Sequence, residues 1–265
     1  MKAATALGIG VGLAGLAIGG IMEGTSPATL INIPALLIVL VGTYGATMAS
    51  VGWGPMSKIP KLYQITFSPR QPDLRERVDL LVGIAEQARR EGLLALDAQL
   101  GDIDDEFTRK GLQLVVDGTD PDLVREILEA EIDGMEARHR AGAAPFEKAG
   151  GYAPTMGIIG TVMGLVHVLQ NLADPSSLGP AISTAFIATL LGVGTANLVF
   201  LPVAVRLKAL SEEEVELRTL TLDGILAVQA GDNPRVVADK LISYVPPAER
   251  READDENVTP LREAA

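Results

Sequence analysis

The sequence predicts an all-α membrane protein with four transmembrane helices in two hairpins, a helical cytoplasmic domain between the second and third helices, and a helical C-terminal tail. Three observations predict this fold class. Hydrophobic residues make up 48% of the 265 residues, and the mean hydropathy is positive, at +0.27, which favours a membrane protein. Four long stretches contain no charged side chain, and the basic residues lie on only one side of them.

Each of the four uncharged stretches is predicted to form one transmembrane helix. They are residues 3–22, 27–53, 149–173 and 175–205. A helix needs about 20 apolar residues to cross the roughly 30 Å hydrocarbon core of a bilayer, and each stretch reaches that length. Tight links at residues 23–29 and 174–179 join the stretches in pairs, which predicts two hairpins.

The basic residues predict how the hairpins are oriented. Of the 22 Lys and Arg residues, Lys2 precedes the first helix, 13 lie within residues 54–148, and the other eight follow the fourth helix. Neither tight link contains a basic residue. Because basic segments stay on the cytoplasmic side, we predict that both termini and the long segment between the hairpins are cytoplasmic.

A cleaved signal peptide at residues 1–22 is an alternative to the first helix. No clear small-x-small cleavage site follows this stretch, and a second apolar stretch begins within seven residues. Both features favour a retained transmembrane helix.

The predicted segments follow from this organisation. They are a transmembrane hairpin at 1–53, a cytoplasmic helical domain at 54–148, a second transmembrane hairpin at 149–205, and a cytoplasmic helical tail at 206–265 with a disordered end beyond Pro246. The second hairpin is the candidate ion pathway.

Apolar periodicity and turn residues predict the helices of the cytoplasmic segments. Apolar residues at intervals of three and four predict a helix over residues 75–100. A proline between two aspartates predicts a second helix over residues 121–140, after a turn at Gly118. The tail is predicted to be helical over residues 211–244, with a break at the sequence GDNP of residues 231–234.

The composition argues against several classes of function. A net charge of −12 disfavours nucleic-acid binding. With no Cys and two His residues, the sequence offers no set of metal ligands. The glycines at positions 8, 10 and 12 lie inside a predicted span, so they form no nucleotide-binding loop. No nucleophile and base stand out as a pair, and we predict neither enzymatic activity nor a cofactor.

The predicted spans contain no Asp, Glu, Lys or Arg. Proteins that move ions usually carry an ionisable group at membrane depth. The sequence therefore indicates either that a partner chain supplies a carboxylate or that this chain carries no ions. His167, near the outer end of the third span, fits packing or an interface better than proton transfer.

Two prolines and two threonines in the third and fourth spans are candidate functional residues. Pro154 and Pro202 lie near the cytoplasmic leaflet, where a proline either kinks or hinges its helix or marks a helix end. Thr161 and Thr189 lie near the middle of the membrane. Their hydroxyls either line an aqueous path or bond back to carbonyls of their own helices.

Six ordered motifs extend along the chain. They are ARREGLLALD at 88–97, DGTD at 117–120, MEARH at 135–139, GYAPTMGIIGTVMGLVH at 151–167, DPSSLGP at 174–180 and AFIATLLG at 185–192. In this order they resemble the flagellar stator proteins of the MotA family, and the resemblance covers residues 1–241. The related energisers of outer-membrane transport usually have three spans, whereas this sequence predicts four.

The resemblance implies a function in bacterial motility at the inner (cytoplasmic) membrane. Such chains form five-membered rings around a dimer of single-span MotB-type partners, which bring the ion-carrying aspartate and a wall-binding domain. Ion flow changes the shape of the ring or rotates it, and the cytoplasmic domain pushes on the rotor switch protein FliG. A partner that supplies the aspartate agrees with the absence of a carboxylate from the spans.

The resemblance also implies roles for individual residues. Pro154 and Pro202 match the two prolines that couple ion flow to conformational change. Arg89 and Asp97 match the charged pair that faces the rotor, although the second position is usually Glu in the family. A solvated helix face is the alternative reading of both charges.

The translocated ion is expected to be the proton. Sodium-type members of the family carry hydroxyls at the positions of Thr161, Ala188 and Thr189, and this chain has Ala at the middle one. Threonine oxygens can partly replace the hydration shell of sodium, so a sodium-driven stator remains an alternative.

Two other functions are compatible with the pattern. A TolQ- or ExbB-like energiser of an envelope transport complex would share the last two spans and the missing carboxylate. A non-conducting membrane scaffold would place Thr161 and Thr189 against lipid or packed backbone.

Overall fold

In the computed structural model, every regular element of the described residues is helical, which confirms the all-helical fold class. The described residues are 4–68, 73–173, 175–247 and 250. They belong to two compact units: unit 1 comprises Met1–Arg70 and Arg138–Leu210, and unit 2 comprises Gln71–Ala137 and Ser211–Ala265. Two helices, α8 (Pro121–Gln170) and α10 (Leu201–Ala230), contribute residues to both units.

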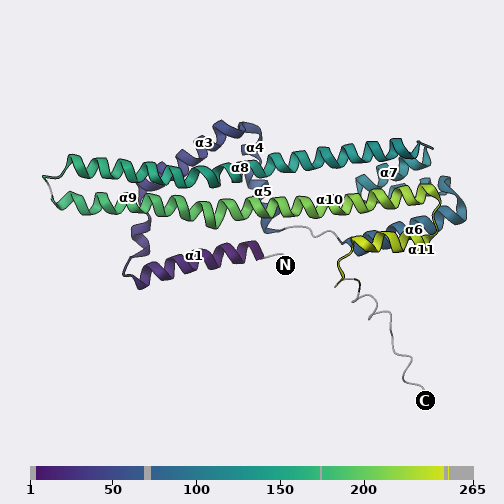
Figure 1. Cartoon of the computed structure of the whole chain (residues 1–265), viewed down its shortest axis with the longest axis horizontal. Coiled ribbons are helices and arrows are strands. Elements are labelled where there is room, and N and C mark those ends of the chain that lie inside the picture. Colours follow the sequence, from purple (N-terminus) through teal and green to yellow (C-terminus); the bar gives the residue numbers. More distant parts are fainter. Residues whose placement is uncertain (1–3, 69–72, 174, 248–249, 251–265) are drawn as a thin grey trace, which may run out of the picture. The chain divides into compact units, whose positions relative to one another are not determined.

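Unit 1 contains the apolar helices, and α8 and α9 lie side by side in it (Figure 1). Besides its parts of α8 and α10, unit 1 consists of α1 (Ala4–Met22), η1 (Pro27–Leu30), α2 (Ile33–Leu36), η2 (Leu37–Val41), α3 (Gly42–Val51), α4 (Trp53–Ser57), α5 (Ile59–Phe67), α9 (Pro175–Thr195) and η4 (Ala196–Phe200). By length and composition, four helical stretches of the described chain can cross a membrane: Ala4–Met22, Ile33–Val51, and parts of Pro121–Gln170 and Leu178–Ala230. The chain is therefore a membrane protein.

The second candidate span begins at Ile33, six residues later than the uncharged stretch that predicted it. Asn32 ends the preceding irregular segment because its side chain accepts a hydrogen bond from the N–H of Ala35, at 3.1 Å. Pro34 occupies the first turn, where its missing N–H has no cost. The wide π-helical turn η2 follows and leads into α3.

The third candidate span has no helix boundary at its N-terminal end. Helix α8 starts at Pro121, as predicted, after Gly118 turns the chain with a φ of +73°. It then continues for 50 residues to Gln170 and does not end near residue 140. The alanine-rich sequence AGAAPFEK at residues 141–148 favours helix, and Pro145 is accommodated inside it.

Two small apolar clusters hold unit 1 together. In one, Phe146 of α8 packs with residues of α10, and the ring of Tyr63 from α5 meets it edge-on at a centroid distance of 5.1 Å. In the other, Ala35 and Val39 of the second span pack against Ala188 of α9.

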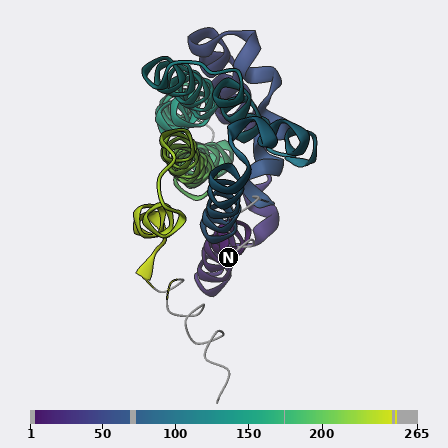
Figure 2. The same ribbon diagram turned by 90° about the vertical axis from the view of Figure 1, so that its right-hand side faces the viewer.

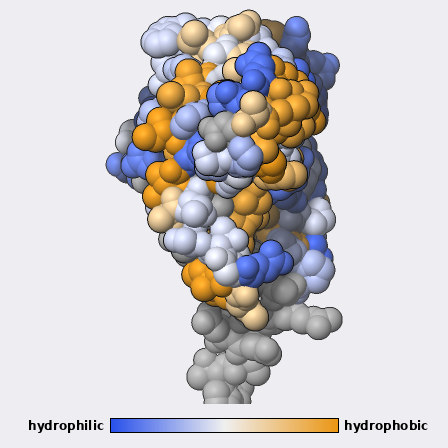
Figure 3. Space-filling view, turned by 90° about the vertical axis from the view of Figure 1, so that its left-hand side faces the viewer, coloured by the Kyte–Doolittle hydropathy of each residue, from blue (hydrophilic) through white to orange (hydrophobic). Residues whose placement is uncertain are grey.

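Many large apolar side chains of unit 1 remain exposed in the single chain. Leu169 of α8 is 67% exposed and Phe186 of α9 is 66% exposed. None of the residues of α1 is buried. Figure 3 shows orange, apolar side chains over much of the face it presents. Such a surface suits lipid or neighbouring membrane helices.

Unit 2 is a helical domain with its own hydrophobic core (Figure 2). Besides the first part of α8 and the second part of α10, its elements are α6 (Leu74–Glu91), η3 (Leu93–Asp102), α7 (Glu106–Val116), α11 (Pro234–Leu241) and η5 (Ile242–Tyr244). The core takes large buried side chains from six of these elements: Leu81, Leu96, Phe107, Leu128, Ile225 and Leu241.

The helix predicted over residues 75–100 is wrong after residue 91. Helix α6 ends at Glu91, because Gly92 adopts a φ of +88° that side-chain-bearing residues avoid. A 3₁₀ segment, η3, follows, and then the short helix α7, which the sequence did not predict. In the next helix, α8, Leu123 is 46% exposed and its neighbour Val124 is buried.

Asp105 fixes the start of α7. Its carboxylate accepts a hydrogen bond from the N–H of Thr108 at 2.9 Å and pairs with the Arg77 guanidinium at 2.8 Å. Partial burial raises the pKa of Asp105, but the hydrogen bonds from Thr108 and the charge of Arg77 outweigh it, so the pKa lies below its ordinary value. The carboxylate therefore stays ionised at neutral pH and links α6 to α7.

The predicted break in the tail is confirmed. Helix α10 ends at Ala230, and Gly231 follows with a φ of +72°. The side chain of Asn233 then accepts a hydrogen bond from the N–H of Arg235 and caps α11. The predicted disordered end begins after Pro246, and most of it lies outside the described residues.

Candidate functional site

The candidate site lies where α8 and α9 approach most closely. A Cβ added at Gly157 would lie 2.9 Å from the carbonyl oxygen of Ala188, and one at Gly192 only 2.5 Å from that of Ala153. Further along α8, a Cβ at Gly164 would lie 2.7 Å from the Cβ of Ala185. Rising numbers on α8 meet falling numbers on α9, so the helices are antiparallel and their backbones touch.

Thr161 and Thr189 meet inside this interface. Their hydroxyls are hydrogen-bonded to each other. The Thr161 hydroxyl also lies 3.1 Å from the carbonyl oxygen of Gly157 on its own helix and 3.0 Å from that of Ala185 on the neighbouring helix. The structure therefore brings these two predicted residues together, and the Thr161 hydroxyl bonds back to a carbonyl of its own helix, which is one of the two expected alternatives.

The chemistry of this pair is limited to hydrogen bonding and coordination. A threonine hydroxyl donates one hydrogen bond and accepts two, and it stays neutral at physiological pH. In this arrangement the two hydroxyl protons are used between the pair and the backbone carbonyls. The pair can offer oxygen atoms to a passing proton or cation, but another group must carry the charge.

The second span covers the outer part of this interface. The side-chain amide of Asn32 donates a hydrogen bond to the Thr184 hydroxyl of α9 at 2.8 Å. Nearer the middle of the span, a Cβ at Gly42 would lie 3.0 Å from the sulfur of Met156 in α8. Sequence reasoning missed Asn32 and Thr184, because their partnership joins residues 152 positions apart.

The two predicted prolines occupy different local environments. Pro154 lies inside α8, next to Ala153, which forms the tight contact with Gly192. Pro202 is the second residue of α10, directly after the π-helical turn η4. In that turn the N–H of Leu201 bonds to the carbonyl of Ala196, five residues earlier, and the wider turn leaves room for a proline ring.

The stretch of α8 that packs against α9, residues 149–170, contains no Asp, Glu, Lys or Arg. His167 is in the last turn of α8, where the amide of Asn171 donates to its backbone carbonyl at 2.8 Å. At the other end, Glu147 of α8 forms an ion pair with Lys208 of α10. Within the described residues, no group of acids and histidines is arranged to hold a metal ion.

Arg89 and Asp97 are both exposed, on either side of the Gly92 turn in unit 2. Arg89 is in the last turn of α6, and Asp97 lies in η3. On the inner side of the same two elements, residues such as Leu81 and Leu96 are buried in the core. This arrangement keeps both charges on the surface and available to a partner.

Comparisons with known proteins agree on one family. Residues 99–219 match the model of the MotA/TolQ/ExbB proton channel family. The chain is 39% identical over 251 residues to motility protein A of Bacillus subtilis, an alignment that covers 94% of this chain and 93% of the relative. Two solved structures also match, and each match covers 93% of this chain and 97% of the chain in the solved structure. The flagellar MotAB stator complex of B. subtilis matches with a TM-score of 0.87 and 39% identity, and MotAB of C. jejuni matches with a TM-score of 0.88 and 30% identity.

The contact between α8 and α9 predicts a strong effect of a single methyl group. We expect Gly192→Ala to lower the free energy of unfolding by about 1–3 kcal/mol, because the added Cβ overlaps the carbonyl of Ala153. The measurement is thermal unfolding of the purified chain in detergent. Gly194→Ala is the matched control, since a Cβ there meets nothing within 4 Å. Equal unfolding temperatures for the two variants would contradict the proposed contact.

Proposed function

Because the chain belongs to the MotA/TolQ/ExbB proton channel family, we propose that it is a stator subunit of the bacterial flagellar motor. With a MotB-type partner it forms an ion channel and couples ion flow to torque on the rotor. It is not an enzyme. The observation that carries this function is the packed Thr161–Thr189 pair, between two apolar stretches, residues 149–173 and 175–205, that contain no carboxylate.

The missing carboxylate defines what the partner contributes. A dimer of single-span partner chains supplies the aspartate that carries the ion, and five copies of this chain surround it. The apolar residues left exposed on unit 1, such as Leu169 and Phe186, support such an assembly, because a ring of membrane helices needs apolar faces toward neighbours and lipid.

The topology places both termini and the long polar segment in the cytoplasm of the host, with the four spans as two hairpins in the inner membrane. The supporting observation is the distribution of basic residues, which are absent from both short links. Unit 2, with Arg89 and Asp97 on its surface, is the part that meets the rotor protein FliG.

The translocated ion is the proton. Ala188 takes the place of the middle hydroxyl of sodium-type relatives, and its methyl group packs against Gly160, where a Cβ would lie 2.7 Å away. The remaining two hydroxyls are bonded to each other and to carbonyls. A dehydrated sodium ion requires more oxygen ligands than this pair supplies.

Swimming speed under independently varied gradients tests both the function and the ion. We expect deletion of the chain to abolish swimming, and re-expression to restore a speed that follows the proton gradient and ignores sodium. Speed that follows sodium would retain the stator function and overturn the ion. If swimming were unchanged by deletion of the chain in a strain that also lacks any other stator system, an envelope energiser of the TolQ or ExbB type would be favoured.

Pro154 and Pro202 couple ion flow to movement, because each interrupts the backbone hydrogen bonding of a helix next to the α8–α9 contact. We expect Pro154→Ala and Pro202→Leu to slow or stop rotation while the partner still copurifies. Pro180→Ala is the control and should swim normally, because Pro180 lies near the start of α9, at the opposite end of that helix from the Ala153–Gly192 contact. Normal speed of a bead tethered to the motor in both variants would remove this role.

Arg89 and Asp97 contact the rotor through charge. We expect Arg89→Glu to reduce motor torque, and reversal of one acidic residue on the rotor to restore part of it, since opposite charges steer and align two surfaces. Arg235→Glu, an equally exposed change on α11, is the control for altered net charge. The absence of rescue by every rotor charge reversal would argue against an electrostatic contact.

A further inference from the structure

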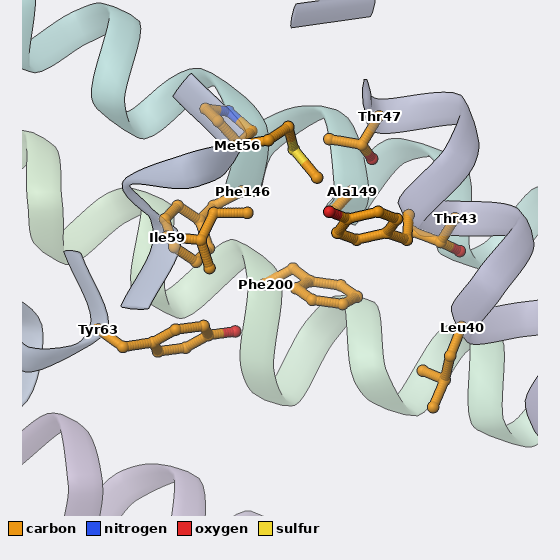
Figure 4. Close-up of a pocket in the computed structure, with 11 residues that line it drawn as sticks. Leu40, Thr43, Thr47, Met56, Ile59, Tyr63, Phe146, Ala149 and Phe200 are labelled. Carbon is orange, nitrogen blue, oxygen red and sulfur yellow. The ribbon is translucent and has the colours of Figure 1, made fainter. Parts of the chain in front are cut away.

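A cavity of about 170 Å³ lies inside unit 1, beside the cytoplasmic half of the second span. Figure 4 shows Leu40, Thr43 and Thr47 of that span along one side and Ile59 and Tyr63 of α5 on the opposite side. The remaining walls are mainly apolar, with Met56, Phe146, Ala149 and Phe200. An apolar cavity of about 150 Å³ is already large enough to bind a benzene ring.

Two hydroxyls in the wall of this cavity have no partner among the described residues. Thr43 and Thr47 are each only 2% exposed, and neither hydroxyl forms a hydrogen bond there. Other threonines in the helices of unit 1 bond to the carbonyl four residues earlier, as Thr66 and Thr195 do. Burying an unpaired hydroxyl costs free energy, so a bound group that accepts a hydrogen bond would stabilise this wall.

Hydrocarbon suits the cavity better than water. A buried water needs two to four polar partners, and most of these walls are aliphatic or aromatic. Leu40 and Tyr44, one helical turn apart, are 40% and 47% exposed, so the cavity reaches the surface of the second span between them. An acyl chain could enter there from the surrounding bilayer.

The flank of the cavity is positively charged. Lys58 and Lys61 are exposed and adjoin Met56 and Ile59, which line the cavity. Residues 24–72 contain no acidic side chain. Glu147, beside Phe146 in α8, is already paired with Lys208. Basic residues at a membrane surface attract anionic lipid head groups.

We propose that this cavity is a binding site for one anionic phospholipid of the leaflet at the cytoplasmic end of the second span. An acyl chain occupies the apolar space beside Leu40 and Phe200. Thr47, one turn before the end of α3, donates a hydrogen bond to an ester carbonyl, and the phosphate lies near Lys58 and Lys61. The proposal uses the topology given above and requires no ion transport.

Retained lipid tests the proposal independently of motility. The full-length chain, purified with its partner, is washed in detergent, and bound phospholipid per chain is measured by mass spectrometry. The bound phospholipid is then exchanged by incubating the complex with vesicles of phosphatidylglycerol or phosphatidylcholine. We expect the unmodified chain to retain phosphatidylglycerol in preference to phosphatidylcholine.

Ala149→Phe fills the cavity, since Ala149 is a buried part of its wall. We expect at least a roughly ten-fold loss of retained lipid, because excluding two methylenes from an apolar site weakens binding by about that factor. Ala49→Phe, at an exposed position of α3 that does not line the cavity, is the matched control and should retain lipid. Full retention in Ala149→Phe would place the lipid elsewhere and overturn the proposal.

The combined change Lys58→Gln and Lys61→Gln tests the head-group contact without altering the packing, because both lysines are exposed. We expect the preference for phosphatidylglycerol to fall roughly 10- to 30-fold, since each basic residue contributes about five-fold. Arg235→Gln with Lys240→Gln, in unit 2, removes the same charge and should leave the preference unchanged. Equal retention of both lipids by the unmodified chain, or none of either, would overturn the proposal.

Discussion

Direct backbone contact between α8 and α9 is the constraint on which the rest of unit 1 depends. Gly157 and Gly192 bring the two helices so close that a methyl group at either position would overlap a carbonyl oxygen. In a bilayer, helices gain little by burying apolar surface against each other, so close packing of small residues has to hold them together. This proximity is also what places the hydroxyls of Thr161 and Thr189 in contact.

The same close packing explains why the apolar spans contain no ionisable side chain of the Asp, Glu, Lys or Arg type. Glycine and alanine bring backbones together but leave no space for an ionisable side chain, and none is present in the four uncharged stretches. A charge buried there would need a partner or a water-filled path. The chain therefore provides a neutral wall with two hydroxyls, and its own spans contain no carboxylate that could carry an ion.

Two long helices, α8 and α10, continue without interruption from residues of unit 1 into residues of unit 2. Both α8 and α10 continue through prolines, and the wide turn η4 accommodates Pro202 where a regular turn would clash. Unit 2 relies on a conventional hydrophobic core and on caps such as Asp105, so its stability does not depend on the membrane. Arg89 and Asp97 are exposed on the surface of this unit.

The sequence by itself determined the four apolar helices, the start of α8 at Pro121 and the break after Ala230, because charge, hydropathy, proline and glycine act over a few residues. It also determined the absence of a membrane carboxylate. Only the tertiary structure decided the existence of α7, the Thr161–Thr189 contact, and the cavity beside Thr43. Each of these depends on which distant residues come together, and local patterns carry no record of such contacts.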